Sequence, residues 1–494
     1  MAKKDRAVVI GTGVGGLGAA VRLALKGYRV DAFEAAPTYG GKLAECWLGD
    51  YRFDMGPSVF AMPHRVEELF ELAGVPMAGH FQYRKLEKTF RYFWGDGTRV
   101  QGWSDPQRLA EELERVLQVP PQRTLDHVRR AHRLLDTTGR TFMEHSLHHV
   151  KTLWKGGVGR ALFNARVPEL MDTLHEVDKR QFKDPKAVQF FDRFATYNGS
   201  NPYTTPGIMR MIAGLEHERG PFYPIGGMRT IVSSLHALAE KVGVRFHFNA
   251  PVERILLDPT KRKVTGVRAH GADHGADVVV CNMDIEPAYR KLLPDLRAPE
   301  RTLKQERSTS AIVFYWGIKR SFPELGLHNI FFSNDYRAEF AQLFDKLDVT
   351  DDPTVYVNIT SKEDAPDAPP GCENWFAMIN APYLAGQDVD AMVRRTRAAI
   401  LGKLQRILGV DIEPLIVVED VLDPARIQER TQSHLGSIYG TSSNSKWAAF
   451  RRHPNQHPKV RGLRFCGVTV HPGGGIPLAL LSAKLATETL PDAR

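Results

Sequence analysis

Four glycines near the amino terminus have the spacing of a phosphate-binding turn. They follow an apolar run at 6–10 and are Gly11, Gly13, Gly15 and Gly16. A helical pattern comes next, and a second apolar run at 29–33 ends at Glu34. Gly11 permits a tight turn, Gly13 lets a pyrophosphate approach the backbone, and Gly16 lets the helix pack closely on the strand. With Glu34 placed to accept hydrogen bonds from a ribose diol, this order predicts a dinucleotide at the helix amino terminus.

A second glycine turn with a cation follows the acid, at Gly40, Gly41 and Lys42. An Asp-x-Gly-Pro segment comes soon after it, ending in Gly56, Pro57 and Ser58. In nicotinamide enzymes the ribose acid is usually followed by another strand–helix unit instead. The sequence therefore favours a different dinucleotide, although the Gly40-Gly41 pair taken alone is equally consistent with an ordinary surface turn.

The other half of the site is expected at the carboxyl-terminal end. A strand-like run ends at Gly467, and a helical pattern begins after Gly473, Gly474, Gly475, Ile476 and Pro477. Glycines before a helix allow close backbone approach and expose N–H donors, which suit a flavin pyrimidine edge or ribityl oxygen. We also expect Val252, at the start of a strand-like run, to contact the cofactor.

A proton acceptor has to be sought among isolated residues, because no Ser-His-Asp order or carboxylate pair stands out. His471 is the first candidate, since its loop is expected to lie nearest the cofactor. It serves either as the acceptor or only as a brace for the loop. The other candidates are Glu216, His217 and His328, each of which also has a purely structural interpretation.

Several blocks together resemble the bacterial carotenoid desaturase family, phytoene desaturase and its relatives, within the amine oxidase-like flavoproteins. The blocks are 193–203, 223–228 and 471–477, and the resemblance extends along essentially the whole chain. It implies FAD, with the Gly40–Lys42 turn beside the diphosphate and the 56–58 segment near the isoalloxazine. It also implies removal of two hydrogens from a lipophilic carotenoid. The 437–446 and 471–477 segments are closest to the 1-hydroxycarotenoid 3,4-desaturase branch; phytoene desaturase is the alternative.

The order of these segments predicts an α/β fold with a discontinuous Rossmann-type FAD domain. Residues 1–75, 218–290 and 455–494 are expected to build it. The segment 76–217 is expected to form a mostly helical cap, and 291–454 an α+β substrate domain with a mixed sheet. A length of 494 residues is ample for two or three domains.

The net charge of +9 indicates either a negatively charged partner or cations that are simply exposed to solvent. Cations, including Lys151 and Lys155, alternate with large apolar residues over 140–180, a pattern typical of helices in an anionic membrane interface. The alternatives are a cap that packs its apolar stripes on its own core, or nucleic acid, for which no binding module is present. Since a long polyene resides in lipid, we expect a peripheral, monotopic protein on the inner face of the cell membrane.

The remaining sequence features limit location and metal binding. No run approaches the ~18–20 apolar residues of a membrane span, and the amino terminus lacks a signal-peptide pattern, which favours the cytoplasm. The four cysteines, Cys46, Cys281, Cys372 and Cys466, have no metal-ligand spacing, so no metal is expected.

Two other classes share the predicted fold. One is a flavin amine oxidase-like enzyme, and the other is a non-catalytic lipid-binding chaperone such as the Rab GDP-dissociation inhibitors. The complete fingerprint with Glu34 argues against loss of FAD and hence against the second class.

Overall fold

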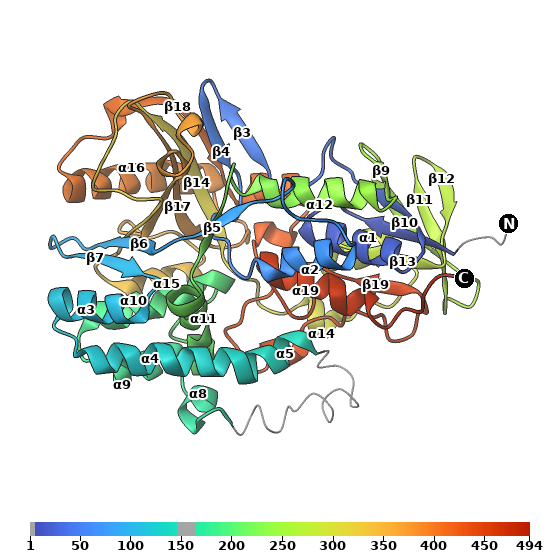
Figure 1. The fold of residues 1–494 in the computed structure, drawn as a ribbon, viewed down its shortest axis with the longest axis horizontal. Helices are drawn as coiled ribbons and strands as arrows, with labels where there is room; N and C mark the ends of the chain where they lie inside the picture. Colours follow the sequence, from blue (N-terminus) through green and yellow to red (C-terminus); the bar gives the residue numbers. More distant parts are fainter. Residues whose placement is uncertain (1–4, 146–163) are drawn as a thin grey trace.

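Five parallel strands carry the first glycine turn in the computed structural model, which describes residues 5–145 and 164–494 (Figure 1). Their order is β19-β13-β1-β2-β9, and every neighbouring pair runs parallel. They are β1 (Arg6–Ile10), β2 (Arg29–Phe33), β9 (Arg245–His247), β13 (Val278–Cys281) and β19 (Leu463–Phe465). Strands from the beginning, middle and end of the chain therefore share one sheet.

The two faces of this sheet are covered differently. Helices pack on one face, and they are α1 (Val14–Leu25), α2 (His64–Leu72), α12 (Arg229–Lys241) and α19 (Ile476–Thr487). An antiparallel sheet of β10 (Val252–Leu257), β11 (Val264–Ala269) and β12 (Ala272–Gly275) packs on the other. The alternation along β1 reflects this, because Ala7 and Val9 face the helices while Val8 and Ile10 face the antiparallel sheet.

A second, mixed sheet of seven strands lies beside the first (Figure 1). Its order is β18-β14-β17-β16-β15-β6-β7. The strands are β6 (Lys88–Phe93), β7 (Arg99–Trp103), β14 (Ser310–Ile318), β15 (His328–Phe331), β16 (Val355–Ile359), β17 (Glu373–Ala381) and β18 (Ile416–Leu422). The long helix α16 (Val389–Leu408) packs on one face through an apolar cluster that includes Trp316 and Trp375.

Strands β6 and β7 differ from the expectation of a mostly helical segment over 76–217. β6 pairs in parallel with β15, so residues 88–103 belong to the sheet of the following segment. The physical reason is that Phe90 and Tyr92 pack under the helical layer while Phe93 packs on the opposite face of the sheet. Aromatic residues that are buried on both faces favour a strand over a one-sided helix.

From Pro106 onward this segment is largely helical and forms the layer along the lower left of Figure 1. The helices are α3 (Pro106–Leu117), α4 (Pro121–Leu134), α5 (Arg140–Glu144), α8 (Val167–Met171), α9 (Leu174–Gln181), α10 (Pro185–Asp192) and α11 (Met211–Gly214). α3 begins where Asp105 accepts a hydrogen bond from the Arg108 N–H, and it buries Leu109 and Leu113. Among the described residues, no helix has the length and apolarity needed to cross a bilayer.

Shorter elements complete the fold. The strands are β3 (Glu45–Leu48), β4 (Tyr51–Asp54), β5 (Tyr83–Lys85) and β8 (Phe222–Pro224). The helices are α13 (Ile285–Pro287), α14 (Glu300–Leu303), α15 (Tyr336–Phe344), α17 (Pro424–Thr431) and α18 (Ala448–Arg451). β3 pairs with β4, and β5 pairs with β8.

Candidate functional site

The first glycine turn lies at the carboxyl end of β1 and leads directly into α1. Gly11 has φ +85°, and a Cβ on Gly16 would lie 1.9 Å from the Gly11 carbonyl oxygen, so the backbone itself requires both glycines. Gly13, by contrast, has φ −66°, and a Cβ there would meet the flexible Asn282 amide at 3.1 Å and the Gly40 carbonyl oxygen at 4.0 Å, an ordinary van der Waals distance. α1 also begins with no capping side chain and no acid in its first turn. The turn thus leaves space and free N–H groups for an anion.

Glu34 is held in place at the carboxyl end of β2. The backbone N–H and hydroxyl of Thr12 donate to its Oε2 at 2.8 and 2.9 Å, and the Ala36 N–H donates to Oε1 at 3.0 Å. The Ala250 N–H donates to the Glu34 carbonyl oxygen at 2.8 Å. This hydrogen bond places the start of β10, including Val252, beside the end of β2. The acid and Val252 therefore border the same end of the sheet.

The second glycine turn packs on the first. Gly40 forms a parallel bridge with Gly13, and its N–H donates to the Thr12 carbonyl at 3.0 Å. Gly40 and Gly41 have φ +115° and +58°, conformations that favour glycine. This pairing distinguishes the turn from an ordinary surface turn.

The ammonium of Lys42 is used elsewhere. It donates to the carbonyl oxygen of Ile438 at 2.8 Å, so the cation ties the second glycine turn to the 437–446 segment. Burial lowers the pKa of Lys42 to about 8, although Asp284 opposes this change. The position of Lys42 beside the diphosphate, which the resemblance implies, stays a prediction.

Asn282, which the sequence analysis did not single out, lies at the centre of the glycine turns. It directly follows β13, and its Oδ1 would be 2.7 Å from a Cβ on either Gly15 or Gly467. The Cys466 thiol approaches the same oxygen at 3.6 Å. Its position just past a buried strand, at the carboxyl edge where ligands bind in such sheets, is the signal that could have found it.

Ser58 connects the predicted cofactor segment to the seven-stranded sheet. The hydroxyl of Tyr356 on β16 donates to Ser58 Oγ at 2.9 Å and lies 2.7 Å from Nδ1 of His328 on β15. Burial lowers the pKa of His328 to about 3, so its ring is neutral. Just before Ser58, a Cβ on Gly56 would lie 1.9 Å from the Lys42 carbonyl, which fixes the Gly56-Pro57 turn against the second glycine turn.

Glu216 and His217 are engaged in holding the helical layer to the sheet. Glu216 accepts hydrogen bonds from Arg193 at 2.8 Å and from the Tyr197 hydroxyl at 2.5 Å. Burial would raise the pKa of Glu216, but Arg193, His217 and Tyr197 together outweigh burial and lower the pKa, so the carboxylate is ionised. His217 donates from Nδ1 to the Trp103 carbonyl at 3.0 Å. These contacts support the structural interpretation of both residues.

His471 is buried under the carboxyl-terminal loop. Its Nε2 donates to the backbone carbonyl of His145 at 2.9 Å, and its backbone N–H donates to the His453 carbonyl at 3.0 Å. The contact supports the bracing role, because it ties this loop to His145 at the end of α5. A catalytic role for His471 stays a prediction.

The glycines that follow His471 open a second free helix terminus. Gly473 and Gly475 have φ +132° and +110°. α19 begins immediately after Gly475, with Ile476 and Pro477 in its first turn and neither a capping side chain nor an acid there. This terminus repeats the anion-binding features of α1.

Three distant segments meet at this loop. The Tyr439 ring lies between Gly199 and Gly474, because a Cβ on either glycine would come within 2.8 Å of it. The Ser443 N–H donates to the Ser200 hydroxyl at 2.9 Å, and the Asn201 N–H donates to Asn444 Oδ1 at 2.8 Å. The segments 198–201, 437–446 and 473–475 thus form one wall of the site.

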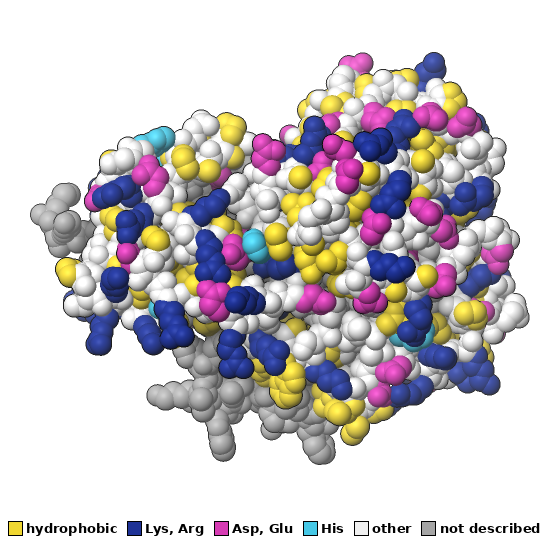
Figure 2. All heavy atoms as spheres, turned by 180° about the vertical axis from the view of Figure 1, so that it is seen from behind, with side chains coloured by type: hydrophobic (Ala, Val, Ile, Leu, Met, Phe, Trp, Pro, Cys, Tyr) yellow, Lys and Arg dark blue, Asp and Glu magenta, His cyan; other side chains and the backbone are white. Residues whose placement is uncertain are grey.

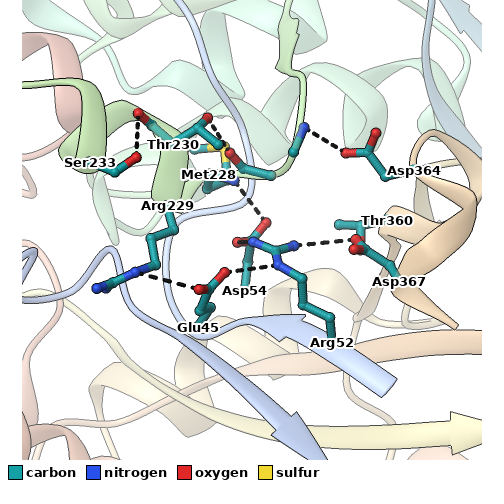
Figure 3. A network of polar contacts seen from close by, with 12 residues as sticks. Glu45, Arg52, Asp54, Met228, Arg229, Thr230, Ser233, Thr360, Asp364 and Asp367 are labelled. Atoms are coloured by element: carbon teal, nitrogen blue, oxygen red, sulfur yellow. Dashed lines mark hydrogen bonds and ion pairs between the residues drawn. The ribbon is translucent and has the colours of Figure 1, made fainter. Parts of the chain in front are cut away.

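A buried ion cluster joins the β3–β4 hairpin to the start of α12 and to the segment at 360–367 (Figure 3). Arg52 on β4 binds Glu45 at 2.9 Å, Asp54 at 2.8 Å and Asp367 at 3.2 Å. Asp54 also accepts a hydrogen bond from the Met228 N–H, at the start of α12. One guanidinium thus orients three carboxylates from the hairpin and the 360–367 segment.

Arg52→Met is expected to destabilise the protein by about 3–5 kcal/mol, because it leaves buried carboxylates without their cation. Burial raises the pKa of Asp54 and of Asp367 even with Arg52 present. The folded state therefore takes up protons in the window above the normal carboxyl pKa, and stability falls as the pH rises through the raised values. Urea unfolding at pH 5 and pH 8 should show a larger loss for the variant at pH 8.

Arg268→Met is the matched control, since Arg268 pairs with Asp273 on an exposed hairpin and its loss should leave unfolding unchanged. Equal stability of the Arg52 and Arg268 variants would contradict the role of the cluster.

The chain matches one family model along residues 14–490, that of the flavin containing amine oxidoreductases. The chain belongs to this family. A flavin carried on a dinucleotide-binding turn is FAD, so the predicted cofactor and the flavoprotein fold are confirmed. Within the described residues, no group of three His, Cys, Asp or Glu side chains could hold a metal ion.

Individual relatives of this flavin containing amine oxidoreductase are similar over nearly their full length. A 1-hydroxycarotenoid 3,4-desaturase from Flavobacterium sp. is 46% identical, covering 99% of both chains. A phytoene desaturase from Phycomyces blakesleeanus is 31% identical over 100% of this chain and 86% of its own. The crystal structure of an oxidoreductase from Methanosarcina mazei has a TM-score of 0.65 at 16% identity, covering 98% of this chain and 100% of that one. The predicted resemblance to carotenoid desaturases is thereby confirmed.

The described site fits FAD on its own geometry. The amino termini of α1 and α19 lack any capping side chain or acid. The backbone conformation at Gly13 does not require a glycine, so the missing side chain leaves space for a ligand. Glu34 is oriented by Thr12 as a ribose acceptor. We infer that the Gly11–Gly16 and Gly40–Gly41 turns hold the diphosphate and that the Gly473–Gly475 loop holds the flavin end.

Proposed function

We propose that this protein is an FAD-dependent carotenoid desaturase that acts on a carotene carrying a tertiary hydroxyl group, introducing the 3,4 double bond. The observation that carries this proposal is the 46% identity to a 1-hydroxycarotenoid 3,4-desaturase across cofactor and substrate segments alike. Phytoene is the alternative substrate, supported by a more distant full-length relative.

The chemistry divides between cofactor and chain. When bound, FAD supplies the acceptor for the hydride that leaves one carbon of the polyene. The chain has to position the substrate, exclude water and accept the proton that leaves the neighbouring carbon. Ser58, Tyr356 and His328 form a hydrogen-bonded row that begins in a cofactor segment and enters the apolar layer around Phe90. We propose this row for the polar contacts with the substrate, because Glu216 is held by Arg193 and Tyr197 and His217 donates from Nδ1 to the Trp103 carbonyl.

The test is anaerobic mixing of the FAD-loaded protein with carotenoids in liposomes. A 1-hydroxylated carotene should bleach the flavin, and its absorption should move to longer wavelength because the conjugated system grows. Phytoene and lycopene serve as matched substrates without the hydroxyl group. Rapid turnover of phytoene alone would support the alternative substrate, and a flavin that stays oxidised with every carotenoid would contradict the desaturase.

We further propose that the protein binds the membrane surface as a peripheral protein, through an apolar patch around α8 and α18. Four exposed side chains define the patch, Val167, Met171, Trp447 and Phe450, with exposures of 72%, 60%, 61% and 40%. Lys446 donates to the Met171 carbonyl and Phe450 packs edge-on against Phe142, so α18 lies beside both α8 and α5. Apolar side chains interspersed with cations also gather along the lower edge of Figure 2. Such a surface suits an anionic lipid interface.

The cations Lys151 and Lys155, on which the membrane interpretation of the sequence rested, lie outside the described residues. The described patch therefore supplies the test. Trp447→Ser should weaken liposome binding in a flotation assay by about tenfold, or about 1.4 kcal/mol, and salt should weaken it further.

Trp47→Ser is the matched control for this assay. Trp47 is 56% exposed and lies on β3, on the opposite side of the molecule from α8 (Figure 1). It should leave flotation unchanged. Equal binding by both variants would contradict this patch as the lipid contact.

A further inference from the structure

Arg452 is a buried arginine with few hydrogen-bond partners. Its side chain directly follows α18 and is only 5% exposed. One terminal nitrogen, Nη2, donates to the Ser443 hydroxyl at 3.1 Å, while Nη1 has no hydrogen-bond partner. Among residues 5–145 and 164–494, no carboxylate forms an ion pair with it. Three other buried arginines, Arg52, Arg193 and Arg307, are each paired with a carboxylate at 3.2 Å or less. Arg464, which is 6% exposed, resembles Arg452 in having nitrogens without a hydrogen-bond partner, but it lies on β19 and not beside the glycine loop before α19.

An unpaired buried guanidinium is costly for the fold. Burying a charge without a counter-charge or a full set of hydrogen bonds disfavours the folded state. We therefore expect a ligand to supply the missing hydrogen-bond acceptor or negative charge. Burial lowers the pKa of Arg452 to about 10, which leaves it charged at neutral pH. The fold therefore maintains a positive charge whose partner is not among the described side chains.

The guanidinium lies against the glycine loop that precedes α19. A Cβ on Gly473 would be 2.3 Å from Nη1 and 2.7 Å from the central carbon of the guanidinium. Gly473 thus combines φ +132°, which favours glycine, with a close approach to the guanidinium, so a side chain there would have to displace Arg452. The nitrogen without a partner is the one that contacts the loop, so Arg452 and the free terminus of α19 present two positive groups to the same place.

We propose that Arg452 binds the pyrimidine edge of the flavin and holds the negative charge that this edge gains on reduction. A hydride brings two electrons and one proton to the neutral isoalloxazine, which leaves one negative charge on the ring system near N1. The other hydrogen leaves the polyene as a proton on the protein side. Because no carboxylate neutralises the guanidinium, its electrostatic attraction to that negative charge is not reduced. This role rests on the proposed FAD site, and it does not depend on which carotenoid is the substrate.

The test compares Arg452→Gln and Arg452→Lys with Arg451→Gln, which removes the adjacent, exposed arginine. The readouts are the midpoint potential of the bound flavin and the dissociation constant of oxidised FAD. Arg452→Gln should weaken binding of reduced FAD about tenfold more than binding of oxidised FAD. This lowers the midpoint potential by about 30 mV for a two-electron couple. Arg452→Lys should retain most of the potential, and Arg451→Gln should match the wild type.

The apoprotein gives an independent readout. Because Arg452→Gln removes an unpaired buried charge, the melting temperature of the apoprotein should stay the same or rise. A lower melting temperature would show that the fold itself needs the arginine and would overturn the proposal. An unchanged potential, or an equal loss of affinity for oxidised and reduced FAD, would also overturn it, the latter by placing Arg452 on the diphosphate. Failure to oxidise carotenoids would count against the proposed function alone, since the potential is measured without substrate.

Discussion

Replacing Gly13 with valine is expected to remove FAD from the protein while the fold persists. Gly13 has φ −66°, which any residue adopts, and the one tight contact of its Cβ position is with the movable Asn282 amide, at 3.1 Å. The polypeptide therefore tolerates a side chain there. The diphosphate does not, because Gly13 begins α1 at the point where its free N–H groups meet the anion. We expect FAD affinity to fall at least about a hundredfold, or about 2.8 kcal/mol.

The measurement is flavin stoichiometry after purification, with circular dichroism as a check on the fold. Gly16→Val is the matched control, since its Cβ would lie 1.9 Å from the Gly11 carbonyl. That variant should lose structure as well as flavin. Stoichiometric flavin in the Gly13 variant would show that the diphosphate does not lie at this turn. The apoprotein should also melt at a lower temperature than the holoprotein, because FAD binds only the folded state.

Gly474→Leu is expected to slow flavin reduction by the carotenoid at least about a hundredfold. A Cβ on Gly474 would lie 2.7 Å from the Tyr439 ring, so leucine has to displace either that ring or the loop before α19. A displacement of about 1 Å between reacting groups costs about two orders of magnitude in rate. Single-turnover bleaching under anaerobic conditions measures the effect directly.

Two further variants make this prediction specific. Gly402→Leu lies inside α16 with only the flexible Arg406 side chain near its Cβ, at 3.4 Å, and should react at the wild-type rate. Tyr439→Ala combined with Gly474→Leu should recover part of the lost rate, because it removes the ring that the leucine meets. Bleaching of the Gly474→Leu variant at the wild-type rate would exclude this loop from the flavin end of the site.

Local patterns in the sequence were sufficient for the dinucleotide half of the site. From 6 to 34 the chain forms a strand, a glycine turn, a helix, a second strand and then Glu34. These elements contact their neighbours in the sequence, and the spacing of apolar residues predicts such local elements well. The resemblance placed the Gly40–Lys42 turn beside the diphosphate, and the structure pairs Gly40 with Gly13 of the first glycine turn. FAD and the carotenoid desaturase relationship likewise followed from motifs that the chain carries in full.

Isolated residues that act over long sequence separations could not be predicted in this way. Asn282 follows an ordinary buried strand, and only the parallel pairing of β13 with β1 brings it under the glycine turns. Arg452 appeared as one cation among many, because its lack of a carboxylate partner is a property of packing. Strand β6 was included in a helical segment because its partner, β15, is more than two hundred residues away. Such contacts depend on the tertiary fold and leave no local period.

The placement of β19 and α19 has a consequence for how the protein matures during synthesis. The dinucleotide sheet places β13 between β1 and β19, and α19 packs on α1. While residues 463–487 are still in the ribosome, the emerging chain lacks one edge strand and the second helix terminus of the cofactor site. FAD capture therefore requires that β19 and α19 have left the ribosome, and until then the nascent chain exposes the apolar face of α1 to chaperones and proteases. In cells short of riboflavin, this protein should accumulate as a chaperone-bound, protease-sensitive species.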